Sequence, residues 1–240
     1  MSAKGVFITG TDTGVGKSIV AATLARLLRD RGIDVGVMKP VTSGCRMENG
    51  RLVSDDAELL AWGAGLPVDA DIAPFLLRQP IAPSEAAYQD GKRVSFRLIG
   101  EAFGRLAAGH DFVIVEGAGG LMVPLDGELL IADLINYLRL PLLVVAGAAL
   151  GTINHTLLTC FSARQLGIAV CGVIINDYPE RPGFAEHSAP QLIGSLAGAP
   201  LLGVFPHVAA DDTRLVVAGL EAGIAADPST EVLLRGVGAI

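Results

Sequence analysis

Short apolar runs recur along the chain, and each ends in glycine or in a polar turn. The runs are rich in Val, Ile and Leu and hardly alternate with polar residues. This pattern is typical of strands that a parallel sheet buries on both faces. We therefore predict strands over Val6–Thr9, Val35–Lys39, Phe112–Val115, Leu142–Ala146, Val170–Ile175 and Leu201–Val204.

Segments with helical spacing lie between these runs. In the first of them the apolar residues fall near one face and the arginines fall elsewhere, which indicates a helix with one buried side. Further helices are predicted over Ser54–Trp62 and Phe96–Ala108. Alternation of strands and helices favours an α/β fold with a doubly wound, mainly parallel sheet. No linker or internal repeat divides the chain, so we expect a single domain over residues 1–240.

Composition and charge exclude several classes of protein. Hydrophobic residues make up 51% of the chain and charged residues 18%, as in a globular protein with a large core. The net charge of −7, without a basic run, argues against a nucleic-acid partner. The stretch Leu138–Leu150 is too short and too interrupted to span a membrane. The 3 cysteines lack metal-type spacing and fit a reducing compartment, so we expect a cytoplasmic protein without membrane partners.

The segment Thr11–Ser18 has the composition of a phosphate-binding loop. It reads Thr-Asp-Thr-Gly-Val-Gly-Lys-Ser and lies between the first predicted strand and the first predicted helix. In such loops the backbone N–H groups surround phosphate, the lysine reaches the β- and γ-phosphates, and the serine binds Mg²⁺. The loop is a variant, because the first glycine of the usual pattern is replaced by Thr11. The sequence therefore predicts a protein that uses ATP or GTP.

Two more charged residues follow predicted strands. Glu116 comes directly after the third run, and Lys39 ends the second. Ligands of open α/β sheets bind at the carboxyl ends of the strands, so both side chains are candidates for the nucleotide site. Taken alone, Glu116 and the glycines after it fit a simple turn, and Lys39 fits an ordinary strand end.

Read in order, these motifs resemble those of the dethiobiotin synthetase family. The resemblance covers about residues 5 to 207 and is carried by seven segments, namely Gly10–Ser18, Lys39–Gly44, Asp56-Ala57, Val115–Gly120, Leu150–His155, Asn176-Asp177 and Leu201–Pro206. It implies a homodimeric enzyme of biotin biosynthesis that closes a ureido ring on 7,8-diaminononanoate, using CO₂ or bicarbonate, ATP and Mg²⁺. A carbamate and a carbamic–phosphoric anhydride are the implied intermediates.

The resemblance also implies roles for individual residues. Lys39 and Lys17 would be catalytic, Ser18, Asp56 and Glu116 would bind the metal, and Thr13 and Ser43 would contact the diamine or its carbamate. The partner subunit's turn, matching Gly151, Thr152, Ile153 and Asn154, would receive the substrate carboxylate. The nucleotide would be bound by Gly14, Val15, Gly16, Lys17, Ser18, Ile19, Asp56, Glu116, Gly117, Ala118, Gly119, Asn176, Asp177, Pro206, His207 and Val208.

Some alternatives stay open at this point. Asn154 also fits an ordinary helix cap, Asp55 stands beside the chosen Asp56, and the preference among nucleotides is not fixed by these motifs. The competing class is the partitioning-type ATPase, a dimeric switch that carries a lysine at the start of the loop, where this chain has Gly10-Thr11. Amidating synthetases of similar fold carry a glutaminase domain, for which 240 residues leave no room.

Overall fold

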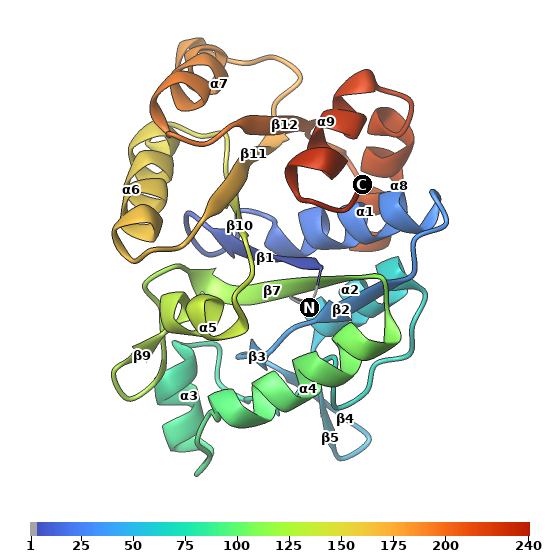
Figure 1. The fold of residues 1–240 in the computed structure, drawn as a ribbon, viewed down its shortest axis with the longest axis vertical. Coiled ribbons are helices and arrows are strands. Elements are labelled where there is room, and N and C mark those ends of the chain that lie inside the picture. Colours follow the sequence, from blue (N-terminus) through green and yellow to red (C-terminus); the bar gives the residue numbers. More distant parts are fainter. Residues whose placement is uncertain (1–3) are drawn as a thin grey trace.

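A six-stranded sheet runs through the middle of the molecule in the computed structural model, which describes residues 4–240 (Figure 1). Its strand order is β12-β11-β10-β1-β7-β2, and all neighbouring pairs are parallel. Each predicted apolar run supplies one strand, and the strands are β1 (Gly5–Gly10), β2 (Val35–Met38), β7 (Phe112–Gly120), β10 (Leu142–Ala146), β11 (Val170–Tyr178) and β12 (Leu201–Pro206).

The carboxyl ends of β2 and β7, which carry two of the predicted site residues, differ from the prediction. Lys39 lies just beyond β2, whereas Glu116 lies inside β7, which continues to Gly120 and pairs there with Gly10 of β1. A Cβ atom on Gly117 would come within 2.8 Å of the Phe7 ring. The absence of side chains therefore lets β7 continue along β1 where larger residues would clash.

Helices cover both faces of the sheet, as the doubly wound prediction requires. On one face α1 packs against the central strands, with α2 and α8 packed against it, while α4 to α7 cover the other face and α9 packs on β12. The helices are α1 (Lys17–Arg29), α2 (Asp55–Ala64), α3 (Pro83–Gln89), α4 (Phe96–Gly109), α5 (Ile131–Leu138), α6 (Thr152–Gln165), α7 (Phe184–Leu196), α8 (Thr213–Ile224) and α9 (Pro228–Gly236).

Helix α1 is buried on more sides than its sequence pattern predicts. Ile19, Ala22, Ala25 and Leu28 are the apolar residues that fall near one face of this helix in the sequence. Ile19 is only half-buried, whereas Val20, Ala21, Leu24 and Leu27, which that face does not include, are buried. The cause is tertiary, because α2 and α8 cover the side of α1 that faces away from the sheet. The helix that follows the phosphate loop therefore lies inside the molecule.

Three two-stranded sheets lie in the segments that connect the strands of the main sheet. They are the parallel pair β3 (Val41–Thr42) and β6 (Phe75–Leu76), the hairpin β4 (Arg46–Glu48) and β5 (Arg51–Val53), and the hairpin β8 (Pro124–Asp126) and β9 (Leu129–Leu130). Within residues 4–240, none of the helices has both the length and the apolar character needed to cross a bilayer.

The strand order places a binding crevice at β1. From β1 the chain moves outward to β2, and then returns through β7 to β10 on the other side of β1. Such a reversal opens a crevice at the carboxyl ends of the strands, where open α/β sheets bind ligands. The segment Thr11–Gly16 leaves β1 at that end of the sheet.

Candidate functional site

The loop between β1 and α1 has the backbone shape of a phosphate cradle. Gly14 and Gly16 have left-handed φ angles of 78° and 87°, which glycine adopts without strain. Lys17 opens α1, and its Nζ atom donates to the carbonyl of Asp12, 3.2 Å away, across the loop. Helix N-termini of this kind direct backbone N–H groups at an anion. The loop is therefore suited to bind the phosphates of a nucleotide.

A buried cluster of a lysine and two carboxylates lies beside this loop. The Lys39 Nζ atom is 2.5 Å from Glu116 Oε1 and 2.8 Å from Asp56 Oδ2. The Ser18 hydroxyl donates to the same Glu116 oxygen at 2.8 Å. These side chains come from α1, the end of β2, α2 and β7, so only the folded chain brings them together.

Burial and the opposite charges shape the electrostatics of the cluster. The Lys39 side chain is 3% exposed and that of Glu116 is 0% exposed. Burial alone lowers the pKa of Lys39, but the carboxylates of Glu116 and Asp56 outweigh it and raise that pKa above its usual value. Burial likewise tends to raise the pKa of Asp56, whereas Lys39, Ser18 and Lys17 bring it below its usual value. The pair of Lys39 and Asp56 is thus held in its charged form.

Lys17 has a different environment. Burial, the largest influence, lowers the pKa of Lys17, although Glu116 acts in the opposite direction. Its one hydrogen bond among the described residues goes to a backbone carbonyl. An ammonium that is buried without a direct carboxylate partner gains more from an incoming anion than a solvated one does.

The oxygen atoms of Ser18, Asp56 and Glu116 form a donor set that fits Mg²⁺. Glu116 Oε2 is buried and has no hydrogen-bond partner within the described part of the chain. Across residues 4–240 there is no cluster of three or more His, Cys, Asp and Glu side chains that could hold a metal alone. Mg²⁺ in nucleotide sites commonly takes one or two carboxylates and completes its shell with phosphate oxygens and water, so two carboxylates and a hydroxyl suffice.

The start of α2 determines which aspartate faces the cluster. Ser54 caps the helix, because its Oγ atom accepts from the Ala57 backbone N–H at 3.1 Å. The same hydroxyl donates to Thr42 Oγ1 at 3.0 Å, which ties α2 to the segment after Lys39. Asp55 does not contact Lys39 but accepts from Arg46 at 2.7 Å. Asp56 is therefore the aspartate that contacts Lys39.

A cavity of about 370 Å³ connects the loop with the cluster. It is lined by predicted site residues, namely Thr13, Gly14, Gly16, Lys17, Ser18, Ile19, Lys39, Ser43, Asp56, Glu116, Ala118 and Gly119. Asp55, the alternative to Asp56, lines it as well. The sequence analysis did not single out Val41, Thr42, Leu59 and Thr213, which also line it. Thr213 opens α8 and reaches the cavity only because α8 packs on α1. Local sequence carries no signal for that contact.

The residues expected near the base lie at the carboxyl ends of β11 and β12. The Asn176 side chain is buried and donates from Nδ2 to the Val15 carbonyl at 3.1 Å. Asp177 has a left-handed φ of 59°, and its carboxylate is 2.6 Å from His207 Nδ1. Pro206 ends β12, and Val208 follows beside α8. The structure thus brings Asn176 against the phosphate loop and leaves the Asp177–His207 pair more exposed.

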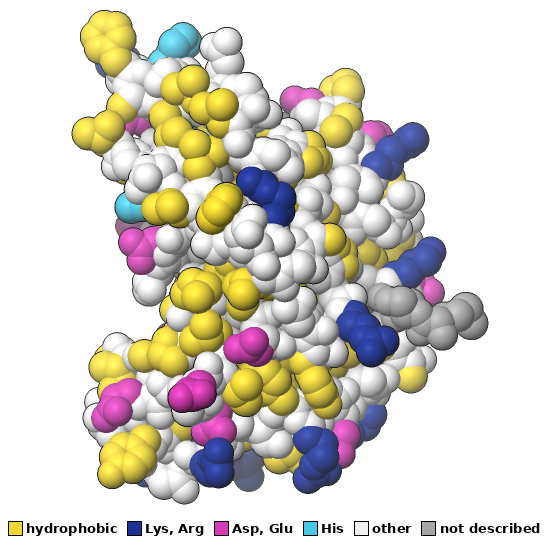
Figure 2. All heavy atoms as spheres, turned by 60° about the vertical axis from the view of Figure 1, so that its left-hand side comes forward, with side chains coloured by type: hydrophobic (Ala, Val, Ile, Leu, Met, Phe, Trp, Pro, Cys, Tyr) yellow, Lys and Arg dark blue, Asp and Glu magenta, His cyan; other side chains and the backbone are white. Residues whose placement is uncertain are grey.

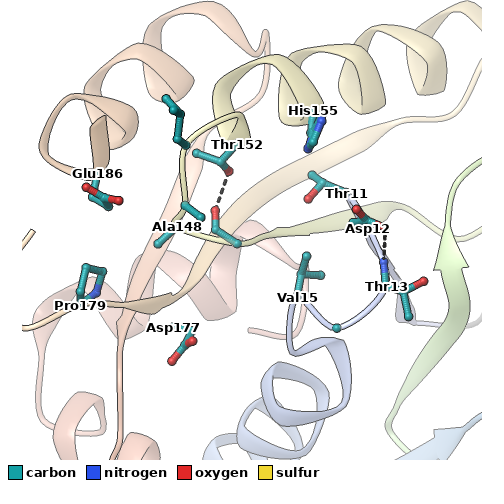
Figure 3. Close-up of a pocket in the computed structure, with 14 residues that line it drawn as sticks. Thr11, Asp12, Thr13, Val15, Ala148, Thr152, His155, Asp177, Pro179 and Glu186 are labelled. Atoms are coloured by element: carbon teal, nitrogen blue, oxygen red, sulfur yellow. Dashed lines mark hydrogen bonds between the residues drawn. The ribbon is translucent and has the colours of Figure 1, made fainter. Parts of the chain in front are cut away.

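A second cavity, of about 480 Å³, lies between the outer side of the phosphate loop and the start of α6 (Figure 3). His155 points from α6 toward Thr11 and Asp12, and Thr152 hydrogen bonds to the Gly147 carbonyl at 2.5 Å. Gly151, with a φ of 101°, is the N-cap of α6. Asn154 is therefore not the helix cap. Of the predicted turn, only Thr152 lines this cavity, while Gly151, Ile153 and Asn154 do not.

Solved structures share the fold. A ParA family ATPase from Chlorobium tepidum TLS has a TM-score of 0.55 at 15% identity, covering 99% of this chain and 98% of its own. The septum site-determining protein MinD from Pyrococcus horikoshii OT3, solved with Mg-ADP, has a TM-score of 0.56 at 17% identity, covering 98% of this chain and 91% of its own. At such identities the likeness concerns the arrangement of helices and strands alone.

Sequence relatives are much closer. The family model described as an AAA domain matches residues 4–213. An ATP-dependent dethiobiotin synthetase BioD from Bacillus licheniformis is 44% identical, covering 85% of this chain and 86% of its own. The proteins of the same name from Bacillus subtilis strain 168 and Thermodesulfovibrio yellowstonii are 40% and 39% identical, covering 86% and 85% of this chain and 88% and 89% of theirs. This chain therefore belongs to the family of ATP-dependent dethiobiotin synthetases.

Proposed function

We propose that this protein makes dethiobiotin from 7,8-diaminononanoate, CO₂ or bicarbonate, and ATP. The observation that carries the proposal is the meeting of Lys17, Lys39 and the oxygens of Ser18, Asp56 and Glu116 around one cavity beside the phosphate loop. Two buried ammonium groups at one site suit a reaction in which two anions must be brought together.

The proposed reaction has three steps. One amine of the substrate attacks CO₂ and loses a proton, which gives a carbamate. A carbamate oxygen then attacks the γ-phosphorus of ATP, ADP leaves, and a carbamic–phosphoric anhydride forms. The second amine attacks the carbamoyl carbon, the C–O bond to the phosphate breaks, and the amine loses a proton to the departing phosphate as the ring closes. Lys17 and Lys39 would stabilise the charge of the transferring phosphoryl group and orient the carbamate.

Ser18, Asp56 and Glu116 would hold Mg²⁺. The ion would neutralise part of the charge on the phosphates, which lowers the cost of bringing an anionic carbamate to them. Support comes from the buried and unpartnered Glu116 Oε2 and from the Ser18 hydroxyl beside it.

The remaining predicted contacts divide between phosphates, base and diamine. Gly14, Val15 and Gly16 of the phosphate loop, Ile19 in the first turn of α1, and Gly117, Ala118 and Gly119 of β7 would surround the triphosphate. Thr13 and Ser43, which line the same cavity, would contact the diamine or its carbamate. The base would lie near the ends of β11 and β12, against Asn176, Asp177, Pro206, His207 and Val208.

The proposal includes a homodimer in which the turn Gly151–Asn154 of each subunit reaches the site of the other. The N–H groups at the start of α6 would bind the substrate carboxylate, as helix N-termini bind anions. An apolar surface supports such an interface, and it comprises Met122, Leu150, Leu158 and Phe161, which are 54% to 87% exposed. Figure 2 shows hydrophobic side chains gathered on the face that carries α6. A cavity of about 360 Å³, lined by Met122, Leu158 and Thr11–Thr13, joins this surface to the phosphate loop.

The test of the proposed function measures ADP release with each substrate omitted in turn. We expect ADP and phosphate only when diamine, bicarbonate and Mg-ATP are all present, and ¹³C from bicarbonate should appear in a product of the mass of dethiobiotin. A rate of ATP hydrolysis that does not depend on the diamine, or that rises with DNA or lipid, would contradict the proposal and favour a switch ATPase.

A further inference from the structure

We infer that Asn176 positions the phosphate loop, so that its side chain contributes to phosphate binding without touching the phosphates. The inference rests on the proposed function in one respect, because it takes Thr11–Ser18 to be the phosphate site. It goes beyond the base contact proposed above, since the feature that carries it is a contact within the protein.

The contact joins distant parts of the chain. Asn176 Nδ2 donates to the backbone carbonyl of Val15 at 3.1 Å, across 161 positions of sequence. The side chain is 5% exposed. Its strand, β11, is separated from β1 by β10, so the amide reaches the loop from two strands away. A buried amide that donates to a carbonyl in a turn fixes the orientation of that peptide group, because rotating the carbonyl away would leave a buried polar group unpaired.

The same amide packs against Gly16. A Cβ atom on Gly16 would lie 2.1 Å from Asn176 Nδ2 and 3.2 Å from its Cγ. Gly16 is the N-cap of α1 and has no side-chain cap to hold it. Its left-handed φ of 87° determines where the N–H groups of the first turn of α1 point. Asn176 therefore holds the carbonyl on one side of this residue and fills the space beside it.

The residues that follow Asn176 anchor its backbone to the end of β12. The next residue, Asp177, adopts a left-handed φ of 59°, and its carboxylate is 2.6 Å from His207 Nδ1. The His207 backbone N–H donates to the Tyr178 carbonyl at 2.8 Å. These contacts fix the end of β11 to the end of β12. Asn176 thus links the carboxyl ends of β11 and β12 to the phosphate loop through one short, polar side chain.

Tripolyphosphate is the probe that separates this role from a contact with the base, because it has phosphates and no base. We expect Asn176→Ala to weaken the binding of Mg²⁺-tripolyphosphate and of Mg-ADP by similar factors of about three to ten, the range of one hydrogen bond. Isothermal titration calorimetry measures both. Asn136→Ala is the matched control, since Asn136 Nδ2 donates to the Leu166 carbonyl at the same 3.1 Å, away from the loop. It should leave both affinities unchanged.

If Asn176→Ala weakens the binding of Mg-ADP and leaves the affinity for tripolyphosphate unchanged, the inference is overturned. Asn176 would then act only through a contact with the base. A second readout needs no ligand. Hydrogen exchange of the amides of residues 11–18 should accelerate in Asn176→Ala and not in Asn136→Ala, and unchanged exchange there would also overturn the inference. If the alanine variant does not fold, Asn176→Asp removes the donor while keeping the side-chain shape, and the exchange experiment is done on it.

Failure of the proposed function gives a different result. Lys17→Ala should abolish tripolyphosphate binding if the loop is the phosphate site. If wild-type protein and Lys17→Ala bind tripolyphosphate equally, the assignment of the loop is wrong, whereas the exchange experiment still decides whether Asn176 holds its shape.

Discussion

At the scale of single residues, Lys39 combines deep burial with contacts to two carboxylates. Its ammonium lies between Glu116 and Asp56, at 2.5 and 2.8 Å. A lysine in that position is held close to the place where the γ-phosphate and the carbamate would meet. It therefore has more to contribute to the transition state than to the binding of nucleotide.

The variant Lys39→Gln tests whether Lys39 acts mainly in the transition state and not in nucleotide binding. We expect the rate of dethiobiotin formation to fall by orders of magnitude, while the Kd of Mg-ADP changes by less than about threefold. Product formation is followed by mass spectrometry and nucleotide binding by calorimetry. Lys92→Gln is a suitable control, because Lys92 is an exposed lysine bonded only to the Leu76 carbonyl. A product rate near that of the control would make Lys39 structural.

Lys39 should also influence the affinity of the proposed site for a divalent metal. The Lys39 ammonium contacts Glu116 Oε1 and Asp56 Oδ2, and both carboxylates belong to the proposed Mg²⁺ site, so Lys39 and a bound Mg²⁺ would share their negative charge. In the absence of nucleotide we expect Lys39→Met to bind Mn²⁺, a spectroscopic substitute for Mg²⁺, at least about tenfold more tightly than wild type. Electron paramagnetic resonance measures the free ion. Equal or weaker binding would show that Lys39 and the metal do not share these ligands.

At the scale of elements, the start of α2 would couple helix capping to the proposed metal site. Ser54→Ala removes the cap and the bond to Thr42, and should lower the free energy of unfolding by about 1 kcal/mol. Because Asp56 lies in the turn that Ser54 caps, we also expect the Mg²⁺ concentration for half-maximal activity to rise.

Ser95→Ala is the matched control for this prediction. Ser95 caps α4 in the same way, accepting from the Leu98 N–H at 3.3 Å, on the opposite face of the sheet. Ser95→Ala should lower the free energy of unfolding, measured by chemical denaturation, by an amount similar to that of Ser54→Ala. It should leave the Mg²⁺ concentration for half-maximal activity unchanged. If both variants shift the requirement equally, the effect belongs to general destabilisation.

The elements also show what the sequence could and could not predict. The six strands were predictable because runs such as Leu142–Ala146 are apolar on both sides, and only a buried parallel strand tolerates that. The meeting of Lys39, Asp56 and Glu116 could be anticipated from motifs near strand ends and from the family resemblance. The bond from Asn176 to Val15 could not, because it depends on the register of β11 and on the orientation of one amide. Thr213 was missed for a similar reason, since α8 reaches the cavity only through its packing on α1.

At the scale of the whole molecule, the proposed dimer predicts that two defective chains can complement each other. Asn154→Asp places a negative charge at the start of α6, so it should raise the KM for the diamine, about tenfold or more, and leave the KM for ATP unchanged. In a mixed dimer of Asn154→Asp and Lys39→Gln chains, one of the two sites receives both lesions and the other receives neither. Co-expressed pairs with two purification tags should therefore regain activity at low diamine concentration.

A pair of Lys39→Gln and Lys17→Ala chains serves as the control. Both lysines act in the site of their own chain, so each site of that mixed dimer carries one lesion and should stay inactive. Absence of recovery in the first pair, with dimers present by analytical ultracentrifugation, would place the turn Gly151–Asn154 in its own subunit's site.

The covering of α1 by α8 has a consequence for how the protein is made. Residues 17–29 leave the ribosome early, but the helix that covers their outer side, Thr213–Ile224, is synthesised after all six strands of the sheet. At roughly 5–20 residues per second, the interval is about 10 to 40 seconds. Throughout that time the part of the outer side of α1 that α8 covers stays available to chaperones or to other nascent chains. The first helix of the described chain is therefore fully covered only after its second-last helix has been made.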